Sequence, residues 1–306
     1  MRHALLFLAY AVDAVPELGA LYAASGRLHV LMATESARRL KSNFVHIHTQ
    51  TRDDHATCQR LRGDQRWQCV DVTRGEHRAA QLWRRLSTYT SLDSQCRTLH
   101  SDVPNRILKI VAIASTPFKR NVFLDADTVP CFDLATLYTQ LQATDQRGLL
   151  DLYDVLFIPA RESVPREPAR HASWARAPAW VESNGGVIFW RRAPATARLF
   201  HRWIASYCRG GDDLEHFNGG DQHILSREVL TAVQRDRLLV YHLLPIWNFR
   251  SWRRHFSNTP ECCSAASITS ENLRPLPIYI DHGCRKPRDY VKAARFGNAS
   301  WFLGEG

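Results

Sequence analysis

Hydrophobic positions near the start of the chain come in short blocks separated by polar segments. Apolar runs at Leu5–Ala11, Leu28–Ala33 and Phe44–His48 are typical of buried strands. The segments between them, Glu17–Ser25 and Ser36–Lys41, favour a short helix and a helical turn. Strands that alternate with helices indicate a mostly parallel sheet with helices on both faces, and such a sheet binds ligands beyond the carboxyl ends of its strands.

The strongest helical period lies in "SDVPNRILKIVAIAS". Pro104 suits the first turn of a helix, and apolar residues then recur along one side of it. Arg106 and Lys109 are three positions apart, so both project from one side of this helix. The apolar stripe consists of Ile107, Ile110, Val111 and Ala114.

The rest of the chain continues the alternation of strands and helices. Val122–Leu124 and the run "GGVIFW" predict two further strands. Apolar stripes predict helices around residues 134–141, 199–207 and 221–230. Residues 159–180 contain four prolines and several arginines without any period, which favours a long loop. The pattern as a whole predicts an α/β fold.

The composition is that of an ordinary globular protein, with 306 residues, 45% of them hydrophobic and 23% charged. No apolar run approaches the roughly 20 residues that span a bilayer. The run "ALLFLAYAV" has no basic leader and no small-residue cleavage site after it, so we expect neither a signal peptide nor a transmembrane segment. The formal charge of +10 predicts affinity for an anionic partner.

The eight cysteines have no C-x-x-C spacing, which predicts neither a disulfide framework nor a zinc ribbon. Reduced thiols in a cytoplasmic protein are the expectation that follows. A minor alternative is a zinc site, although no ligand pair in it has zinc-finger spacing. Its members would be His282, Cys284, Cys262 and Cys263.

The stretch "NVFLDADTVPCFD" carries an apolar strand directly into Asp125 and Asp127. Buried carboxylates are costly unless something pairs with them. Alternate residues of an extended turn can direct both carboxylates toward one ion, and Mn²⁺ or Mg²⁺ prefers such oxygen ligands. The stretch therefore predicts a Mn²⁺ or Mg²⁺ cofactor, although a lone D-x-D also occurs in caps and turns.

On the residues alone, two functions remain open for a chain with this D-x-D. A phosphatase of the haloacid-dehalogenase type also opens with a D-x-D, and "GGDD" at 210–213 resembles its later acidic motif, but the interval between the two contains no lysine. A non-enzymatic, arginine-rich protein that binds nucleic acid or glycans is the other alternative. Aspartates in a phosphate-facing cleft repel nucleic acid, so we expect no specific nucleic-acid partner.

An ordered series of motifs between residues 105 and 290 resembles the family 8 glycosyltransferases, the group that includes glycogenin and the bacterial lipopolysaccharide galactosyltransferases. The series is "RILKIVAIASTPFKRNVFLDADT", "SNGGVIFW", "GGDQHIL", "LPIWNF" and "HGCRKP". Lys109 lies sixteen residues before Asp125. The family's last motif reads H-x-x-G-x-x-K-P, whereas here His282 directly precedes Gly283.

The resemblance implies a metal-dependent glycosyltransferase that moves a sugar from a nucleotide-diphosphate donor, a UDP-sugar by expectation, to a glycan or protein-linked acceptor hydroxyl with retention. It implies a metal site formed by Asp125, Asp127 and His282. Asp221 and Gln222 match the pair on the reacting side of the sugar. The implied donor-binding residues are Ala9, Tyr10, Asp13, Arg106, Lys109, Asp125, Ala126, Asn184, Gly185, Gly186 and Lys286.

The resemblance also implies the fold and its division. We expect a single GT-A domain over residues 1–306, with a mostly parallel, Rossmann-like central sheet and an acceptor-side extension at its C-terminal end. Residues 1–130 would form the nucleotide-binding half, ending in the D-x-D, and residues 131–306 the half that binds sugar and acceptor. An inverting reaction would instead need a carboxylate base, for which Asp221 and Glu182 are the candidates.

Overall fold

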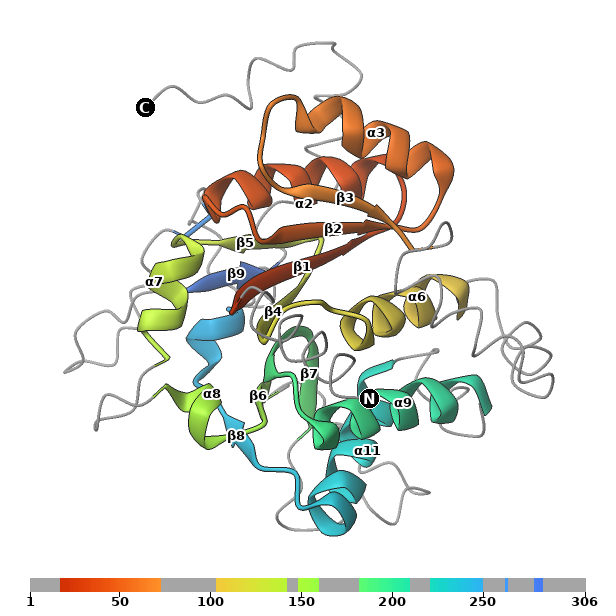
Figure 1. Cartoon of the computed structure of the whole chain (residues 1–306), viewed down its shortest axis with the longest axis vertical. Helices are drawn as coiled ribbons and strands as arrows, with labels where there is room; N and C mark the ends of the chain where they lie inside the picture. Colours follow the sequence, from red (N-terminus) through yellow and green to blue (C-terminus); the bar gives the residue numbers. More distant parts are fainter. Residues whose placement is uncertain are drawn as a thin grey trace, which may run out of the picture.

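A seven-stranded sheet forms the centre of the protein (Figure 1). The computed structural model describes residues 17–72, 103–141, 148–159, 182–209, 221–249, 262–263 and 278–282. The strands of the sheet are β1 (Leu18–Ala24), β2 (Val45–Thr49), β3 (Gln68–Asp71), β4 (Arg120–Asp125), β6 (Val155–Pro159), β7 (Ser183–Arg191) and β8 (Val240–His242). Their order is β3-β2-β1-β4-β7-β6-β8, and only β7 runs antiparallel to its neighbours. The expected α/β fold with a mainly parallel sheet is confirmed.

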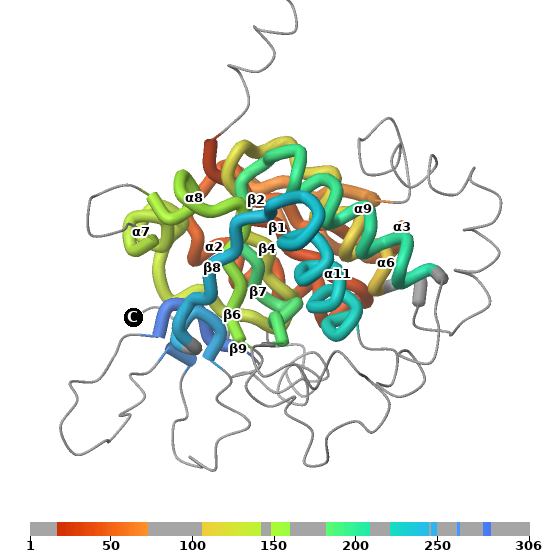
Figure 2. The backbone as a smooth tube through the Cα atoms, turned by 90° about the horizontal axis from the view of Figure 1, so that it is seen from below, coloured from red at the N-terminus to blue at the C-terminus, as the bar shows by residue number. Residues whose placement is uncertain are grey.

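Helices cover both faces of this sheet (Figures 1 and 2). One face carries α6 (Val103–Ala114), α9 (Pro194–Arg209) and α11 (Asp221–Asp236). The other carries α2 (Arg27–Arg39), α3 (Arg52–Arg62), α7 (Leu134–Thr139), α8 (Leu149–Leu152) and the 3-10 helix η2 (Pro245–Asn248). Each face has its own buried hydrophobic cluster, so the sheet is the wall between two cores.

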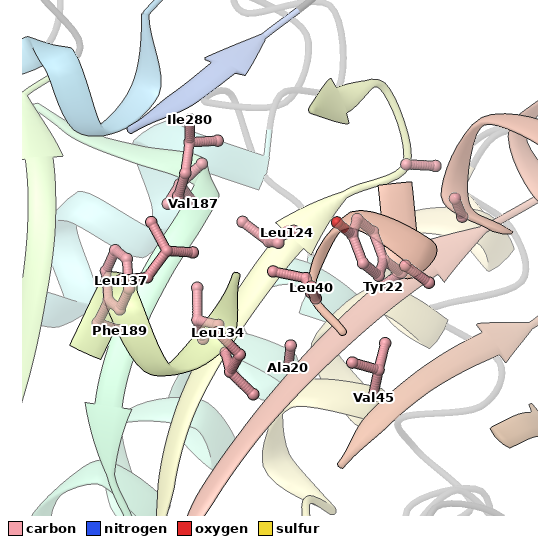
Figure 3. Packing of buried hydrophobic residues seen from close by; sticks show 14 of the residues in the cluster. Ala20, Tyr22, Leu40, Val45, Leu124, Leu134, Leu137, Val187, Phe189 and Ile280 are labelled. Carbon is pink, nitrogen blue, oxygen red and sulfur yellow. The ribbon is translucent and has the colours of Figure 1, made fainter. Parts of the chain in front are cut away.

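The strands alternate their side chains between these two cores, and β4 shows the pattern most simply. Val122 and Leu124 pack on the side of α2 and α7, whereas Phe123 packs on the side of α6. Figure 3 shows Leu124 in the hydrophobic cluster on the side of α2 and α7. This cluster also includes Ala20 of β1 and Phe189 of β7. Because each strand of the sheet's centre is buried on both faces, its sequence is a continuous apolar run.

The sequence pattern was misleading for the first elements. The helix expected at Glu17–Ser25 is wrong, because "LGALYAA" forms strand β1, buried on both faces. The strand expected at Leu28–Ala33 is also wrong. Its buried residues recur with helical spacing and belong to α2, which also absorbs most of the helical turn expected at Ser36–Lys41. The strand expected at Leu5–Ala11 lies outside the described residues.

The later elements agree with their predictions. The run at Phe44–His48 forms β2, shifted by one residue, and Val122–Leu124 lies within β4. The apolar stripes after Pro104 and in the segments 134–141, 199–207 and 221–230 mark α6, α7, α9 and α11. Most of the loop expected at 159–180 lies outside the described residues, as do Lys286 and the proposed C-terminal extension beyond residue 282.

A second, two-stranded sheet was not predicted. It pairs β5 (Thr128–Pro130) with β9 (Ile280–His282) in antiparallel register, so that Thr128 lies opposite His282. In Figure 3, Ile280 of β9 lies beside Val187 of β7, which seats this small sheet on the main one. The pairing begins immediately after the D-x-D and brings His282, the last described residue, next to it.

The expectation of reduced thiols is wrong for the described part of the chain. Cys58 is bonded to Cys69 and Cys131 to Cys263. Cys208 and Cys262 are disulfide-bonded as well, so Cys262 and Cys263 are not available as zinc ligands. Disulfides persist mainly in oxidising compartments, so the expected cytoplasmic location loses its basis. Separately, no helix among the described residues has both the length and the apolar character needed to cross a membrane.

We predict that Gly19→Ala destabilises the fold. A Cβ at this position of β1 would lie 1.8 Å from the ring of Phe118, which is buried, so the ring would have to move within a packed core. Overpacking of this kind typically costs about 1–3 kcal/mol of unfolding free energy, measurable by denaturant unfolding. Gly148→Ala is the matched control, because its new Cβ meets only the carboxylate end of Asp151 at 3.0 Å. Equal stability of the two variants would contradict the prediction.

Candidate metal and donor-binding site

The D-x-D lies at the carboxyl end of β4, in the middle of the main sheet. The strand alternation places Asp125 on the same face as Phe123, toward α6, and Asp127 follows in the turn beyond the strand. Thr128 closes this turn by donating from Oγ1 to the carbonyl of Asp125 at 2.7 Å. A rigid, buried strand therefore presents two carboxylates at the edge where open α/β sheets bind ligands.

His282 reaches the same place from the end of β9. Its Nε2 lies 3.3 Å from Oδ2 of Asp127, and its side chain is 11% exposed. One ligand atom from each of Asp125, Asp127 and His282 can be chosen such that all three lie within 4.8 Å of one another, so this group can hold a metal ion. Two carboxylates and one imidazole suit Mn²⁺ or Mg²⁺ better than a soft metal.

Lys109 of α6 joins the D-x-D to the start of α11. Its Nζ lies 2.9 Å from Oδ1 of Asp125 and 3.3 Å from Oδ2 of Asp221, and 5.2 Å from the centre of the Phe123 ring. Burial alone would lower the pKa of Lys109, but the two carboxylates raise it above its usual value. Lys109 is therefore a buried ammonium.

The two carboxylates of the D-x-D differ in their electrostatics. Burial and the neighbouring charge of Asp127 raise the pKa of Asp125, against the opposing effect of Lys109. Burial would also raise the pKa of Asp127, but hydrogen bonding and attraction to His282 outweigh it and lower that pKa to about 2. The raised pKa of Asp125 reflects burial and neighbouring negative charge that Lys109 does not fully offset, whereas His282 stabilises the carboxylate of Asp127.

Asn184, Gly185 and Gly186 form the wall of the site at the start of β7. The backbone N–H of Gly186 donates to Oδ1 of Asn184 at 2.6 Å. A Cβ on Gly186 would lie 2.8 Å from Cε1 of His282 and 2.9 Å from Oδ2 of Asp125, whereas one on Gly185 would meet Asp221 only at 3.6 Å. Gly186 thus has no space for a side chain, because His282 and Asp125, two of the candidate metal ligands, occupy that space.

Gln222 is tied to this wall and to a buried carboxylate. Its Oε1 accepts a hydrogen bond from the Gly185 N–H at 3.3 Å, and its Nε2 donates to Oε1 of Glu182 at 2.9 Å. Nδ1 of His223 lies 3.1 Å from the same oxygen of Glu182. Asp221 opens α11, and Nε1 of Trp203 donates to its carbonyl at 3.0 Å. The network fixes the first turn of α11 against β7.

The other residues implied by the resemblance are placed less uniformly. Arg106 lies beside Tyr207 of α9, where burial raises the pKa of the tyrosine to about 12 against the opposing charge of Arg106. The side chain of Ala126 packs into the core on the α2 side, so only its backbone faces the D-x-D turn. Ala9, Tyr10, Asp13 and Lys286 lie outside the described residues. Among the described residues, the strand that pairs with the D-x-D strand on one side is β1, in which Ala23 lies opposite Asp125.

Asn248 was not assigned a role from the sequence. It ends η2, is 5% exposed, and its Oδ1 lies 2.8 Å from Nδ1 of His282. The only sequence signal for it is its place in "LPIWNF", one of the ordered motifs.

The disulfide Cys131–Cys263 lies next to the strand that carries His282. Cys131 follows β5 and donates from its backbone N–H to the carbonyl of Tyr279 at 2.9 Å. The N–H of Cys263 donates to Oδ2 of Asp281, a carboxylate that is 2% exposed. The disulfide therefore holds the segment of Cys263 against both strands of the small sheet. Asp281, which Cys263 contacts, directly precedes the candidate metal ligand His282.

Comparison with known proteins places the chain by its fold. No protein-family model and no curated protein sequence matches it. Among solved structures it is similar to mouse xyloside xylosyltransferase 1, with a TM-score of 0.50 and 14% identity over 87% of this chain and 97% of that one. A weaker similarity joins it to the PaToxG glycosyltransferase, with a TM-score of 0.42 and 6% identity over 72% of this chain and 70% of that one. The similarity to the xylosyltransferase confirms the expected GT-A-type fold.

We predict that Gly186→Ala weakens metal binding while Gly185→Ala does not. The first substitution forces a methyl group against His282 and Asp125, and the second makes ordinary van der Waals contacts. A displaced ligand should cost at least the ~10–100-fold in affinity that loss of an outer-shell partner costs. Mn²⁺ titration followed by electron paramagnetic resonance measures it, and equal affinities in the two variants would refute the steric account.

We also predict that Cys131→Ser/Cys263→Ser lowers both stability and Mn²⁺ affinity. This disulfide joins residues 132 apart, and removing a native disulfide typically costs about 2–5 kcal/mol of unfolding free energy. Cys58→Ser/Cys69→Ser is the matched control, because that disulfide joins residues only 11 apart and connects α3 to β3. The control should lose less stability and keep its Mn²⁺ affinity. If the two double variants bind Mn²⁺ equally well, the Cys131–Cys263 disulfide has no role at the site.

Proposed function

We propose that this protein is a metal-dependent glycosyltransferase related to the family 8 enzymes, which moves a sugar from a nucleotide-diphosphate donor to a hydroxyl of a glycan or glycoconjugate. The observation that carries the proposal is the Asp125–Asp127–His282 group at the carboxyl edge of a GT-A-type sheet. The shared fold with a xylosyltransferase supports it. A UDP-sugar is the expected donor and Mn²⁺ or Mg²⁺ the expected ion.

The charge of the site supports a divalent cation. Asp125, Asp127 and Asp221 are three carboxylates, and Lys109 is the one ammonium that ion-pairs with any of them among the described residues. With all three ionised and His282 neutral, these side chains carry two excess negative charges. A divalent ion would neutralise that excess and offer its free positions to phosphate oxygens, which the carboxylates alone would repel.

In the proposed reaction, the bond between the anomeric carbon and the diphosphate oxygen breaks and a bond to the acceptor oxygen forms, while the proton of the acceptor hydroxyl passes to the departing diphosphate. The ion, held by Asp125, Asp127 and His282, would supply positive charge at the leaving diphosphate. Lys109 stays an ammonium and would add to that charge, together with Lys286. Gly185 would leave room for the sugar to approach the backbone, whereas the space beside Gly186 is occupied by His282 and Asp125.

The carboxylate of Asp221 and the amide of Gln222 are the groups we place on the reacting side of the sugar. Both are held before any substrate arrives, Asp221 by Lys109 and Gln222 by Glu182 and the Gly185 N–H. They would stabilise positive charge on the sugar ring, and retention requires no strong base there. Glu182 pairs with Gln222 and His223, which favours a structural role over that of a base for inversion.

The disulfides favour an oxidising compartment over the cytoplasm as the location in which the protein acts. A glycan or protein-linked acceptor is compatible with such a compartment. The basic character of the chain, with a formal charge of +10, fits a donor that carries phosphates.

We predict that one UDP-sugar raises the melting temperature and is hydrolysed or transferred only when Mn²⁺ or Mg²⁺ is present. Asp127→Asn should abolish both effects, because it removes a charged ligand without changing the shape of the side chain. Asp53→Asn, at an exposed position of α3, is the matched control and should behave like the unaltered protein. Thermal shift and product analysis over a panel of nucleotide-sugars measure both.

Other outcomes of the same panel would replace the proposal. Hydrolysis of p-nitrophenyl phosphate without any nucleotide-sugar effect would establish the phosphatase alternative, and salt-sensitive binding of nucleic acid without any nucleotide effect would establish a binding protein. The stereochemistry has its own measurement, since NMR of the product should show the donor's anomeric configuration; an inverted product would refute retention.

A further inference from the structure

The imidazole of His282 is held between two polar groups on opposite sides of the ring. Nε2 faces Oδ2 of Asp127 at 3.3 Å, and Nδ1 faces Oδ1 of Asn248 at 2.8 Å. An amide oxygen can only accept a hydrogen bond, so Nδ1 must carry the proton of this contact. In a neutral imidazole with its proton on Nδ1, the lone pair of Nε2 is directed toward Asp127, an arrangement that a cation bound to both atoms stabilises.

We propose that Asn248 is a positioning residue that fixes the tautomer and the ring orientation of His282, so that Nε2 is ready to bind the ion. This inference rests on the proposed metal-dependent function and adds a residue to it. Metal-binding histidines commonly donate their second ring N–H to a fixed acceptor, and this acceptor sets which nitrogen is free.

The backbone holds the two residues in this relation independently of their side chains. Phe249 donates its N–H to the carbonyl of Ile280 at 2.9 Å, and His282 donates its N–H to the carbonyl of Phe249 at 2.7 Å. The preceding Trp247 stacks on Tyr279 with 4.2 Å between ring centres. Residues 246–249 and 279–282 are therefore held in a fixed register. This register places Asn248 on the Nδ1 side of the His282 ring.

The remaining contacts of Asn248 also leave its amide oxygen as the group that matters. Among the described residues, its Nδ2 has no hydrogen-bond partner, so the contact with His282 decides the orientation of the amide. The residue is 5% exposed, which keeps water from competing for the His282 N–H. A neutral acceptor also orients the ring without adding a further negative charge beside Asp125 and Asp127.

The test uses two substitutions of nearly the same size with opposite chemistry. Asn248→Leu removes the acceptor, and we expect a loss of about 10–100-fold in Mn²⁺ affinity, measured on the full chain by electron paramagnetic resonance. Asn248→Asp keeps an acceptor at the same position, and its affinity should equal or exceed that of the unaltered protein. Asn121→Leu is the structural control, because Asn121 is fully buried and hydrogen-bonded at the other end of β4; it should lose stability without losing Mn²⁺ affinity.

A spectroscopic measurement on the unaltered protein completes the test, even where Asn248→Leu fails to fold. Nitrogen-15 NMR of the Mg²⁺-loaded protein, with His282 identified by comparison with His282→Gln, should show the proton on Nδ1. A proton on Nε2, or normal Mn²⁺ affinity in Asn248→Leu, would overturn the role of Asn248 while leaving the proposed function intact. If the unaltered protein binds neither Mn²⁺ nor Mg²⁺, the metal-dependent function fails and this role fails with it.

Discussion

The ammonium of Lys109 is the group on which the arrangement of the site depends. It connects three elements, α6, β4 and α11, through its ion pairs with Asp125 and Asp221. Removing one partner from a buried ion pair typically costs about 3–5 kcal/mol, because the remaining charge stays buried and unpaired. Loss of Lys109 would leave the carboxylates of Asp125 and Asp221 without this shared partner. The ion pair that joins the start of α11 to α6 would then be lost.

The site divides its requirements among different kinds of structure. Strand β4, packed between two cores, fixes the D-x-D, while the small sheet of β5 and β9 sets the position of His282 relative to it. Because Gly186 has no side chain, His282 and Asp125 can both pack against its backbone. None of these parts could hold an ion alone, and each is rigid for a reason unrelated to the ion. The geometry is therefore prepared by the fold rather than by the ligand.

The sequence was informative where the determining interactions are local. An apolar strand that runs into Asp125 and Asp127 is readable from adjacent residues, and so is the stripe of α6. The first elements were misassigned because a short apolar run such as Leu28–Ala33 fits a strand and a buried helix face equally. The pairing of Thr128 with His282, the contact of Asn248 and the disulfide partners depend on the folded chain, so no spacing rule could reveal them.

The pairing of β5 with β9 has a consequence for how the protein is made. A chain grows from its N-terminal end, so Asp125 and Asp127 emerge from the ribosome long before His282 does. Through most of synthesis, the nascent protein can have its central strands and its two carboxylates but cannot complete the ligand set. An ion that needs all three groups could therefore bind only after β9 has paired with β5.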